Sequence, residues 1–494
     1  MKSCGQRVLN VLKKGRYNYM KQNREKLSMK LRLGYGIGQM SDSLPYNFIA
    51  TYALFFLTDI AGIPVAFAGA IGTIAILWDA VTDPVVGHLS DTSRSKYGRR
   101  RPFMIVSLAP MCLFVVLYFT AVDFGTIGSC VYYVLVAMLY RTFYTGYVIP
   151  YFSLGAEITQ DYDERVTLQC ISAYFVYFAV WLCTAGPMKV IEIALAKGIS
   201  YSNSWILAAL SVALCTLICG WISWRSLRGT EMVDRRDDVR NEEEKRSIKE
   251  VLHTYWVLLK DKICIKIILF RVTFIFSAGL ASSAFVYLMS VNLGLDESQQ
   301  ALYWTLYSAI YIIDIAICNF ISDKTDKRFL MGAAVLFGIL VGVFYYFYNI
   351  TSFNQLILYT FLHSFSAAAF WSVGATMMYD YNEVVEFKTG KRQEGAVSGV
   401  ILFAQKVGSA ISVGTSGMIL SLVGYDGTAE VHTESVKHGI LFLNTLGPAI
   451  ISILTLLCII SYPITRKNFD LLKNALELKR EGKEYSTDGF EKLL

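Results

Sequence analysis

The sequence predicts an all-α membrane protein with twelve transmembrane helices in two six-helix halves. Three observations support this prediction. Only 17% of the 494 residues are charged and 54% are hydrophobic, whereas soluble domains carry roughly 25% charge. Apolar runs of about 20 residues, each long enough to cross the hydrocarbon core, recur along the chain. One long polar interior segment, residues 224–262, separates six such runs from six more.

The expected spans follow these apolar runs. The first six cover residues 34–59, 66–90, 102–122, 127–157, 166–188 and 203–223. The second six cover residues 263–291, 300–321, 329–348, 355–379, 394–423 and 439–463. Bundles therefore occupy 34–223 and 263–463, flanked by a basic segment (1–33), the linker (224–262) and a tail (464–494). Residues 242–262 alternate charged and apolar residues at helical spacing, which indicates a surface helix within the linker.

The charge distribution predicts the orientation. The loop after the second span carries five basic residues, whereas the turn at 61–65 carries none. This bias places both termini and the linker in the cytoplasm of a multi-pass cell-membrane protein. The net charge of +7 is then topological and indicates no nucleic-acid partner. We expect no cleavable signal peptide, because the first thirty residues are basic and polar; a start at Met29 would remove no segment with an identified role.

The two halves resemble each other in sequence. The pattern at 87–91 (GHLSD), after the second span, is similar to 319–323 (NFISD), after the eighth, and both lead into basic turns. With six spans on each side, this similarity favours a duplicated architecture whose halves rock around a substrate near the midplane.

Two carboxylates, Asp79 and Asp83, lie one helical turn apart in the second span and so share one face. An acid at bilayer depth costs roughly 2.5–3.5 kcal/mol, so a positive charge must neutralise the pair. A transported Na⁺ or H⁺ is the simplest candidate, since hard cations prefer oxygen ligands. A structural salt bridge to Arg141 or Lys406 is the alternative.

Several motifs occur in order along the chain. They are 78–87 (WDAVTDPVVG), 98–102 (GRRRP), 144–150 (YTGYVIP), 380–388 (DYNEVVEFK) and 405–409 (QKVGS). Together they resemble the glycoside–pentoside–hexuronide:cation symporter family, of which melibiose permease is the best-known member, over residues 31–465. The resemblance implies the major facilitator fold.

The resemblance also implies roles for particular residues. It assigns cation binding to Asp79 and Asp83 with help from Thr145, a metal site if the ion is Na⁺, and coupling to Lys406. Where the galactoside carrier has two acids and an arginine that bind sugar, this chain has Ser43, Val148 and Ala173. The galactoside pocket is therefore not reproduced, and melibiose is not the expected substrate.

The expected substrate-binding residues are Asp42, Ser43, Arg141, Tyr144, Trp371 and Lys406. Asp42 can replace the missing acid of the first span, because carboxylates bind sugar hydroxyls. Arg141 suits an anionic sugar such as a hexuronide, or it pairs internally with Asp42, Asp79 or Asp83. Tyr144 and Trp371 can stack on a sugar ring. Asp314 is another acid at depth, with no role assigned.

Charged residues beside the second and tenth spans resemble the cytoplasmic gate of the same family. They are Asp91, Arg99, Arg100, Arg101 and Asp380. The acids are expected to pair with the basic loops when the cytoplasmic side closes. Topological charge alone is the alternative explanation of the basic loop.

These observations predict a secondary active symporter that couples inward Na⁺ or H⁺ flow to uptake of a sugar or glycoside, including a hexuronide or pentoside. No GxxxxGK[ST] loop appears, so ATP hydrolysis is not expected. As a transporter, the protein is expected to be no enzyme and to need no cofactor beyond the transported ion. Two alternatives are a cation-coupled lysophospholipid symporter and a non-transporting membrane sugar sensor on the same fold.

Overall fold

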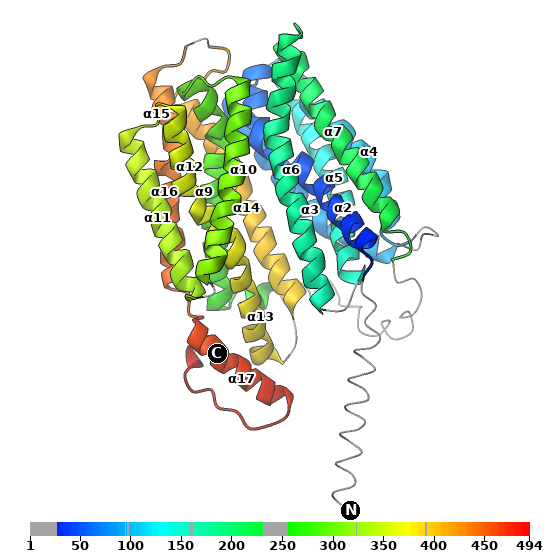
Figure 1. The fold of residues 1–494 in the computed structure, drawn as a ribbon, viewed down its shortest axis with the longest axis vertical. Coiled ribbons are helices and arrows are strands. Elements are labelled where there is room, and N and C mark those ends of the chain that lie inside the picture. The colour runs from blue at the N-terminus through cyan, green and yellow to red at the C-terminus, as the bar shows by residue number, and fades with distance from the viewer. Residues whose placement is uncertain are drawn as a thin grey trace, which may run out of the picture.

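The protein is a bundle of long helices with no β-strand in its described part (Figure 1). The structure is a computed structural model that describes residues 27–93, 95, 98–158, 162–230, 255–322, 324–390, 393–429 and 431–494. The basic segment before residue 27, and most of the surface helix expected at 242–262, lie outside these residues. The predicted all-α membrane architecture is confirmed.

Six helices of the first half precede the linker. They are α2 (Met29–Phe55), α3 (Val65–Thr92), α4 (Arg101–Tyr118), α5 (Gly125–Ile158), α6 (Tyr162–Ala196) and α7 (Tyr201–Ser226). We call this group the N half. The C half consists of α9 (Lys262–Tyr287), α10 (Glu297–Ser322), α11 (Lys327–Tyr348), α12 (Phe353–Ala369), α13 (Ala375–Thr389), α14 (Glu394–Leu422), α15 (Glu434–Asn444) and α16 (Leu446–Ile460). Helix α12 runs into α13 through the π-helical turn η3 (Phe370–Gly374), and α15 and α16 follow each other across Thr445.

Eleven of the described helical stretches are long and apolar enough to cross a membrane. Helix α2, with the π-helical turn η1 (Phe56–Ile60) that extends it, matches the first expected span and packs against α6 and α7. Its polar residues, including Gln39, Ser41 and Asp42, explain why it is less apolar than the other spans. Because polar groups at bilayer depth must face protein or water, this helix is a candidate lining of an internal site.

The first helix of each half ends in the same irregular way. The turn η1 is matched by η2 (Leu288–Asn292) at the end of α9, and each turn is followed by a glycine with positive φ, 66° at Gly62 and 60° at Gly294. Only glycine adopts this backbone conformation at no steric cost. The offset between these glycines equals the offset between the similar patterns at 87–91 and 319–323. The geometry of the backbone thus supports the duplication that the sequence indicates.

The halves lie side by side, and three helix pairs join them: α3 with α14, α6 with α10, and α2 with α9 (Figure 1). We call the end where η1 finishes and α3 begins the distal end, and the end where α2 begins the proximal end. A C-terminal helix, α17 (Arg466–Arg480), lies at the proximal end beneath the C half (Figure 1).

The distal end is closed by contacts between the halves. Tyr425 donates a hydrogen bond to Asp59 (2.7 Å), and the hydroxyls of Thr58 and Tyr287 lie 2.7 Å apart. The backbones of α3 and α14 also touch, because a Cβ built on Gly417 would lie 2.8 Å from the carbonyl oxygen of Val65. At this end the halves are in direct contact.

Two ion pairs between described residues at the proximal end each join elements of the same half. Arg32 binds Glu164 in the N half (2.8 Å), and Lys388 binds Asp261 in the C half (2.7 Å). These pairs hold each half together without linking it to the other.

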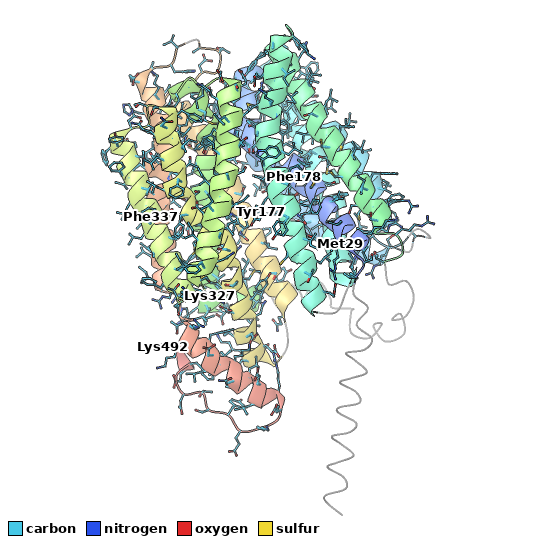
Figure 2. The ribbon with its side chains drawn as sticks, viewed as in Figure 1. Met29, Tyr177, Phe178, Lys327, Phe337 and Lys492 are labelled. Atoms are coloured by element: carbon cyan, nitrogen blue, oxygen red, sulfur yellow. The ribbon has the colours of Figure 1, made fainter. Side chains whose placement is uncertain are left out.

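The outward-facing surface is apolar, as expected of a lipid-facing surface. Phe178 on α6 and Phe337 on α11 are 50% and 40% exposed (Figure 2).

The C-terminal tail forms a helix that packs against the C half. Helix α17 packs Leu472 and Leu476 into the C half, and Arg480 binds Glu386 (2.7 Å).

Candidate functional site

Two carboxylates and a hydroxyl converge inside the N half. Asp79 and Asp83 lie on the same face of α3, since residues four apart are neighbours on a helix. Thr145 on α5 faces them, with its hydroxyl oxygen 2.9 Å from Oδ1 of Asp79 and 3.1 Å from Oδ1 of Asp83. One hydroxyl has one proton to donate, so it is shared between the acids. Thr145 thus lies within hydrogen-bonding distance of both acids that the sequence predicts to bind a cation.

Lys406, from α14 of the C half, reaches the same carboxylates. Its ammonium nitrogen lies 2.7 Å from Oδ2 of Asp79 and also binds Oδ2 of Asp83. Asp79 is nearly buried, with 5% of its side chain exposed, whereas Asp83 and Lys406 are 27% and 28% exposed. We call Asp79, Asp83, Thr145 and Lys406 the carboxylate cluster. It bridges the two halves.

A second positive charge lies beside the carboxylate cluster. Nη1 of Arg141 on α5 is 3.8 Å from Oδ2 of Asp79. The guanidinium carbon also lies over the rings of Tyr46, Tyr140 and Tyr144, at 5.3, 5.8 and 5.9 Å from their centroids. Two acids and two bases therefore balance in charge. Of the two interpretations of Arg141, the internal pair is the one present in this conformation.

A cavity of about 110 Å³ lies between the halves next to the carboxylate cluster. The N half contributes Tyr46, Tyr140 and Arg141 to its wall, and the C half contributes Ser282, Ser409 and other small residues of α9 and α14. Arg141 therefore contacts the cavity on one side and Asp79 on the other. Aromatic rings and hydroxyl groups share this wall with apolar residues such as Ile49 and Leu54, so the wall offers both stacking and hydrogen-bonding groups.

Asp42 on α2 is held in a fixed orientation beside this wall. It accepts hydrogen bonds from Gln39 (2.6 Å) and from the hydroxyl of Tyr144 (2.5 Å). The ring of Tyr144 in turn stacks on that of Tyr46, which lies one helical turn after Asp42. The structure thus brings Asp42, Tyr144 and Arg141 together, and their role in substrate binding stays a prediction.

Of the expected substrate-binding residues, Arg141 lines the cavity, whereas Asp42, Ser43, Tyr144, Trp371 and Lys406 do not. Ser43 is buried and Trp371 is 55% exposed on η3, and neither is among the side chains that line the cavity. A helix rotates by about 100° per residue, so Ser43 cannot face the same way as Asp42. The placement of Trp371 depends on η3, a π-helical irregularity that periodicity in the sequence does not indicate.

The expected gate residues are spread over the proximal end. Arg101, at the start of α4, donates to the carbonyl oxygen of Trp224 (2.9 Å), and its guanidinium lies 4.7 Å from the centre of that ring. Arg99 is partly buried and Arg100 is buried. The side chain of Asp91 lies outside the described residues.

Asp380 on α13 binds Lys327 on α11, 2.9 Å away in its own half. The gate pairing of Asp380 with basic loops across the halves stays a prediction for another conformation.

Sequence reasoning missed several residues of the site. Tyr46 and Tyr140 line the cavity, and the hydroxyl of Thr82 lies 3.4 Å from that of Thr145. A signal for the tyrosines exists, because Tyr46 follows Asp42 by four residues and Tyr140 precedes Tyr144 by four. The serines of the C half carry no such signal.

Comparisons with known proteins identify relatives among membrane transporters. Residues 34–466 match the family described as MFS/sugar transport protein. The inner membrane symporter YicJ of Escherichia coli K12 is 28% identical over 473 residues, covering 93% of this chain and 96% of the relative. The isoprimeverose transporter of Lactiplantibacillus pentosus is 23% identical and covers 80% of each chain.

Solved structures show the same fold at low sequence identity. The xylose transporter XylE of E. coli, in an inward-open conformation, superposes with a TM-score of 0.60 at 11% identity, covering 92% of this chain and 99% of that one. Since the matched family covers most of the chain, the chain belongs to the MFS/sugar transport protein family, and it is a multi-pass membrane transporter rather than an enzyme.

Proposed function

We propose that this protein is a symporter that couples Na⁺ or H⁺ flow to the uptake of a sugar or glycoside by alternating access. One observation carries the proposal: the ammonium group of Lys406 binds both carboxylates of the acid pair, 2.7 Å from Oδ2 of Asp79. A tethered cation from the C half thus occupies the place where a transported cation would neutralise the N half.

Competition between Lys406 and the transported cation supplies the coupling. Two carboxylates and the Thr145 hydroxyl offer oxygen ligands of the kind that hard cations prefer. When a cation binds there, Lys406 loses its partners, and its charge becomes available to the substrate or to water in the cavity. Ion binding then increases the affinity for substrate, and substrate binding increases the affinity for the ion by the same factor. Thr145 suits Na⁺, and the acid pair can equally share one proton.

The polar groups at the cavity and beside it suit a hydroxylated substrate. Arg141 is already paired with Asp79, whereas Asp42 is oriented by two donors and keeps lone pairs for further hydrogen bonds. This arrangement favours a neutral sugar or glycoside over a hexuronide. Relatives named for such cargo include the isoprimeverose transporter and the putative glycoside/cation symporter YagG of E. coli, 25% identical over 440 residues.

The contacts at the two ends support alternating access. The distal end is closed by Asp59, Tyr425 and the contact of Gly417 with α3. A cavity of about 110 Å³ is smaller than the roughly 300–1,000 Å³ of usual ligand pockets, so the halves must separate to admit a sugar. With the termini in the cytoplasm, as the charge distribution predicts, the closed distal end is the outer end, and inward flow requires the distal contacts to break.

The test is accumulation of radiolabelled sugars by proteoliposomes under an imposed Na⁺ or H⁺ gradient. We expect one of the two gradients to drive uptake by the wild-type protein. The variant carrying both Asp79→Asn and Asp83→Asn should show no gradient-driven uptake. Glu434→Gln, which removes an acid 79% exposed at the surface, is the matched control and should leave uptake unchanged. Full accumulation by the double variant would contradict the proposal, as would a wild-type protein that binds sugar without moving it.

A further inference from the structure

The C half contains a buried acid that the carboxylate cluster does not use. Asp314, near the middle of α10, is 1% exposed, and Ser364 on α12 donates a hydrogen bond of 2.5 Å to its Oδ2 atom. Ser364 is itself 5% exposed. Among the residues that the structure describes, no basic side chain forms an ion pair with Asp314. An acid in this position needs another source of neutralisation.

The described groups around Asp314 supply no positive charge. On its own helix, the titratable neighbours are Tyr307, Tyr311 and Cys318. Tyr177 lies on α6 (Figure 2). Its ring contacts that of Tyr311, with 6.5 Å between the centroids.

The bases on neighbouring helices are engaged elsewhere. On α12, His363 stacks on Tyr359 at 5.2 Å. On α11, Lys327 lies at the proximal end and binds Asp380. Neither base is paired with Asp314.

The position of Asp314 corresponds to part of the ion site in the N half. The offset that relates Gly62 to Gly294 relates Thr82 to Asp314. Thr82 contacts Thr145, on the fourth helix of the N half. Asp314 contacts Ser364, on the fourth helix of the C half. The same contact between helices is thus hydroxyl to hydroxyl in one half and hydroxyl to carboxylate in the other.

A single carboxylate with one hydroxyl partner is too small a set of oxygens for a metal ion. Hard cations take about six oxygen ligands or more. The buried surroundings of Asp314 are largely apolar and do not supply that number. One proton neutralises one carboxylate completely, and it also removes the cost of a charge at bilayer depth. The chemistry of the site therefore selects a proton as its ligand.

We infer that Asp314 and Ser364 form a proton-binding site in the C half, separate from the carboxylate cluster. Ser364 donates to Oδ2, so Oδ2 is the carbonyl oxygen and the bound proton resides on Oδ1. The site does not depend on which solute the protein carries, and its test does not require transport.

Infrared difference spectroscopy of the purified, lipid-reconstituted protein during a pH titration tests the site. A protonated carboxyl group shows a carbonyl stretch that a carboxylate lacks. We expect Asp314→Asn to remove one such band. Ser364→Ala, which keeps the acid, should move the same band to higher frequency, because the carbonyl oxygen loses its hydrogen bond. Asp83→Asn is the control and should leave this band in place.

Two results would overturn the inference. One is a protonated-carboxyl region of the Asp314→Asn spectrum that equals the wild-type spectrum at every pH. The other is an Asp314→Asn spectrum that lacks a carboxylate band of the wild type and keeps every protonated-carboxyl band, because this result shows that Asp314 is ionised in the wild type. A thermal melt of each variant establishes that the protein is folded, and Ser364→Ala provides an independent answer if Asp314→Asn unfolds.

Discussion

Tyr425, in the loop after α14, donates a 2.7 Å hydrogen bond to Oδ1 of Asp59 at the end of η1. The other oxygen of Asp59 accepts from Thr58 at 2.5 Å. Both oxygens of one carboxylate are therefore used where the halves meet. Because Tyr425 and Asp59 belong to different halves, the bond must break whenever the distal end opens.

Replacing Tyr425 by phenylalanine should shift the protein toward the distally open state. A hydrogen bond to a charged group contributes about 1.5–3 kcal/mol, so we expect at least a roughly tenfold gain in the open population. The measurement is the labelling rate, by a membrane-impermeant thiol reagent, of a cysteine placed at Ile49 of the cavity in a cysteine-free background. Tyr348→Phe, at an exposed tyrosine, is the control. Equal rates in both variants would refute the role of this bond.

A methyl group at position 417 should have the same effect by steric means. The Cβ of Gly417→Ala would lie 2.8 Å from the carbonyl oxygen of Val65, and neither backbone can rotate away. We expect faster labelling at Ile49 and slower delivery of substrate to the proximal side. Gly395→Ala on the same helix meets nothing within 4 Å, so it should behave as wild type. A Gly417→Ala protein with normal labelling and uptake would show that α3 and α14 separate without difficulty.

Removing the tethered ammonium should strengthen cation binding. In Lys406→Met the acids lose the ammonium group that lies 2.7 Å from Asp79. The transported cation therefore no longer competes with that ammonium group for the carboxylates. We expect the apparent affinity for the coupling ion to rise about tenfold or more, equivalent to about 1.4 kcal/mol, while sugar accumulation is lost. Ion-dependent thermal stabilisation measures the first effect. Lys437→Met removes an exposed lysine of an i,i+3 pair and is the control. An unchanged ion affinity would contradict the competition.

Replacing Arg141 by glutamine separates its two interpretations. Since the guanidinium lies 3.8 Å from Asp79 and covers three tyrosine rings, its loss should unbalance the carboxylate cluster whatever the sugar. We expect uptake of neutral and acidic sugars to fall together, by about tenfold or more. Loss confined to acidic sugars would establish Arg141 as an anchor for an anionic substrate.

Much of the fold was predictable because its determinants are local. The length and hydropathy of each run determine where a helix can cross the bilayer, and eleven described helices meet that criterion. The spacing of Asp79 and Asp83 likewise places both on one face of a helix before any packing is known. The hydrophobic periodicity of the sequence did not indicate the π-helical turns η1, η2 and η3, at which the regular α-helical geometry is interrupted.

The amino-acid sequence by itself determined the class of the protein, its duplicated halves and the position of the acid pair, since hydropathy and helical periodicity depend on neighbouring residues. Only the tertiary structure decided which charges meet. It placed Lys406 on the acids, Asp380 on Lys327 in its own half, and Trp371 away from the cavity. These contacts join helices far apart in the chain, so they depend on how the halves pack and not on any spacing within one helix.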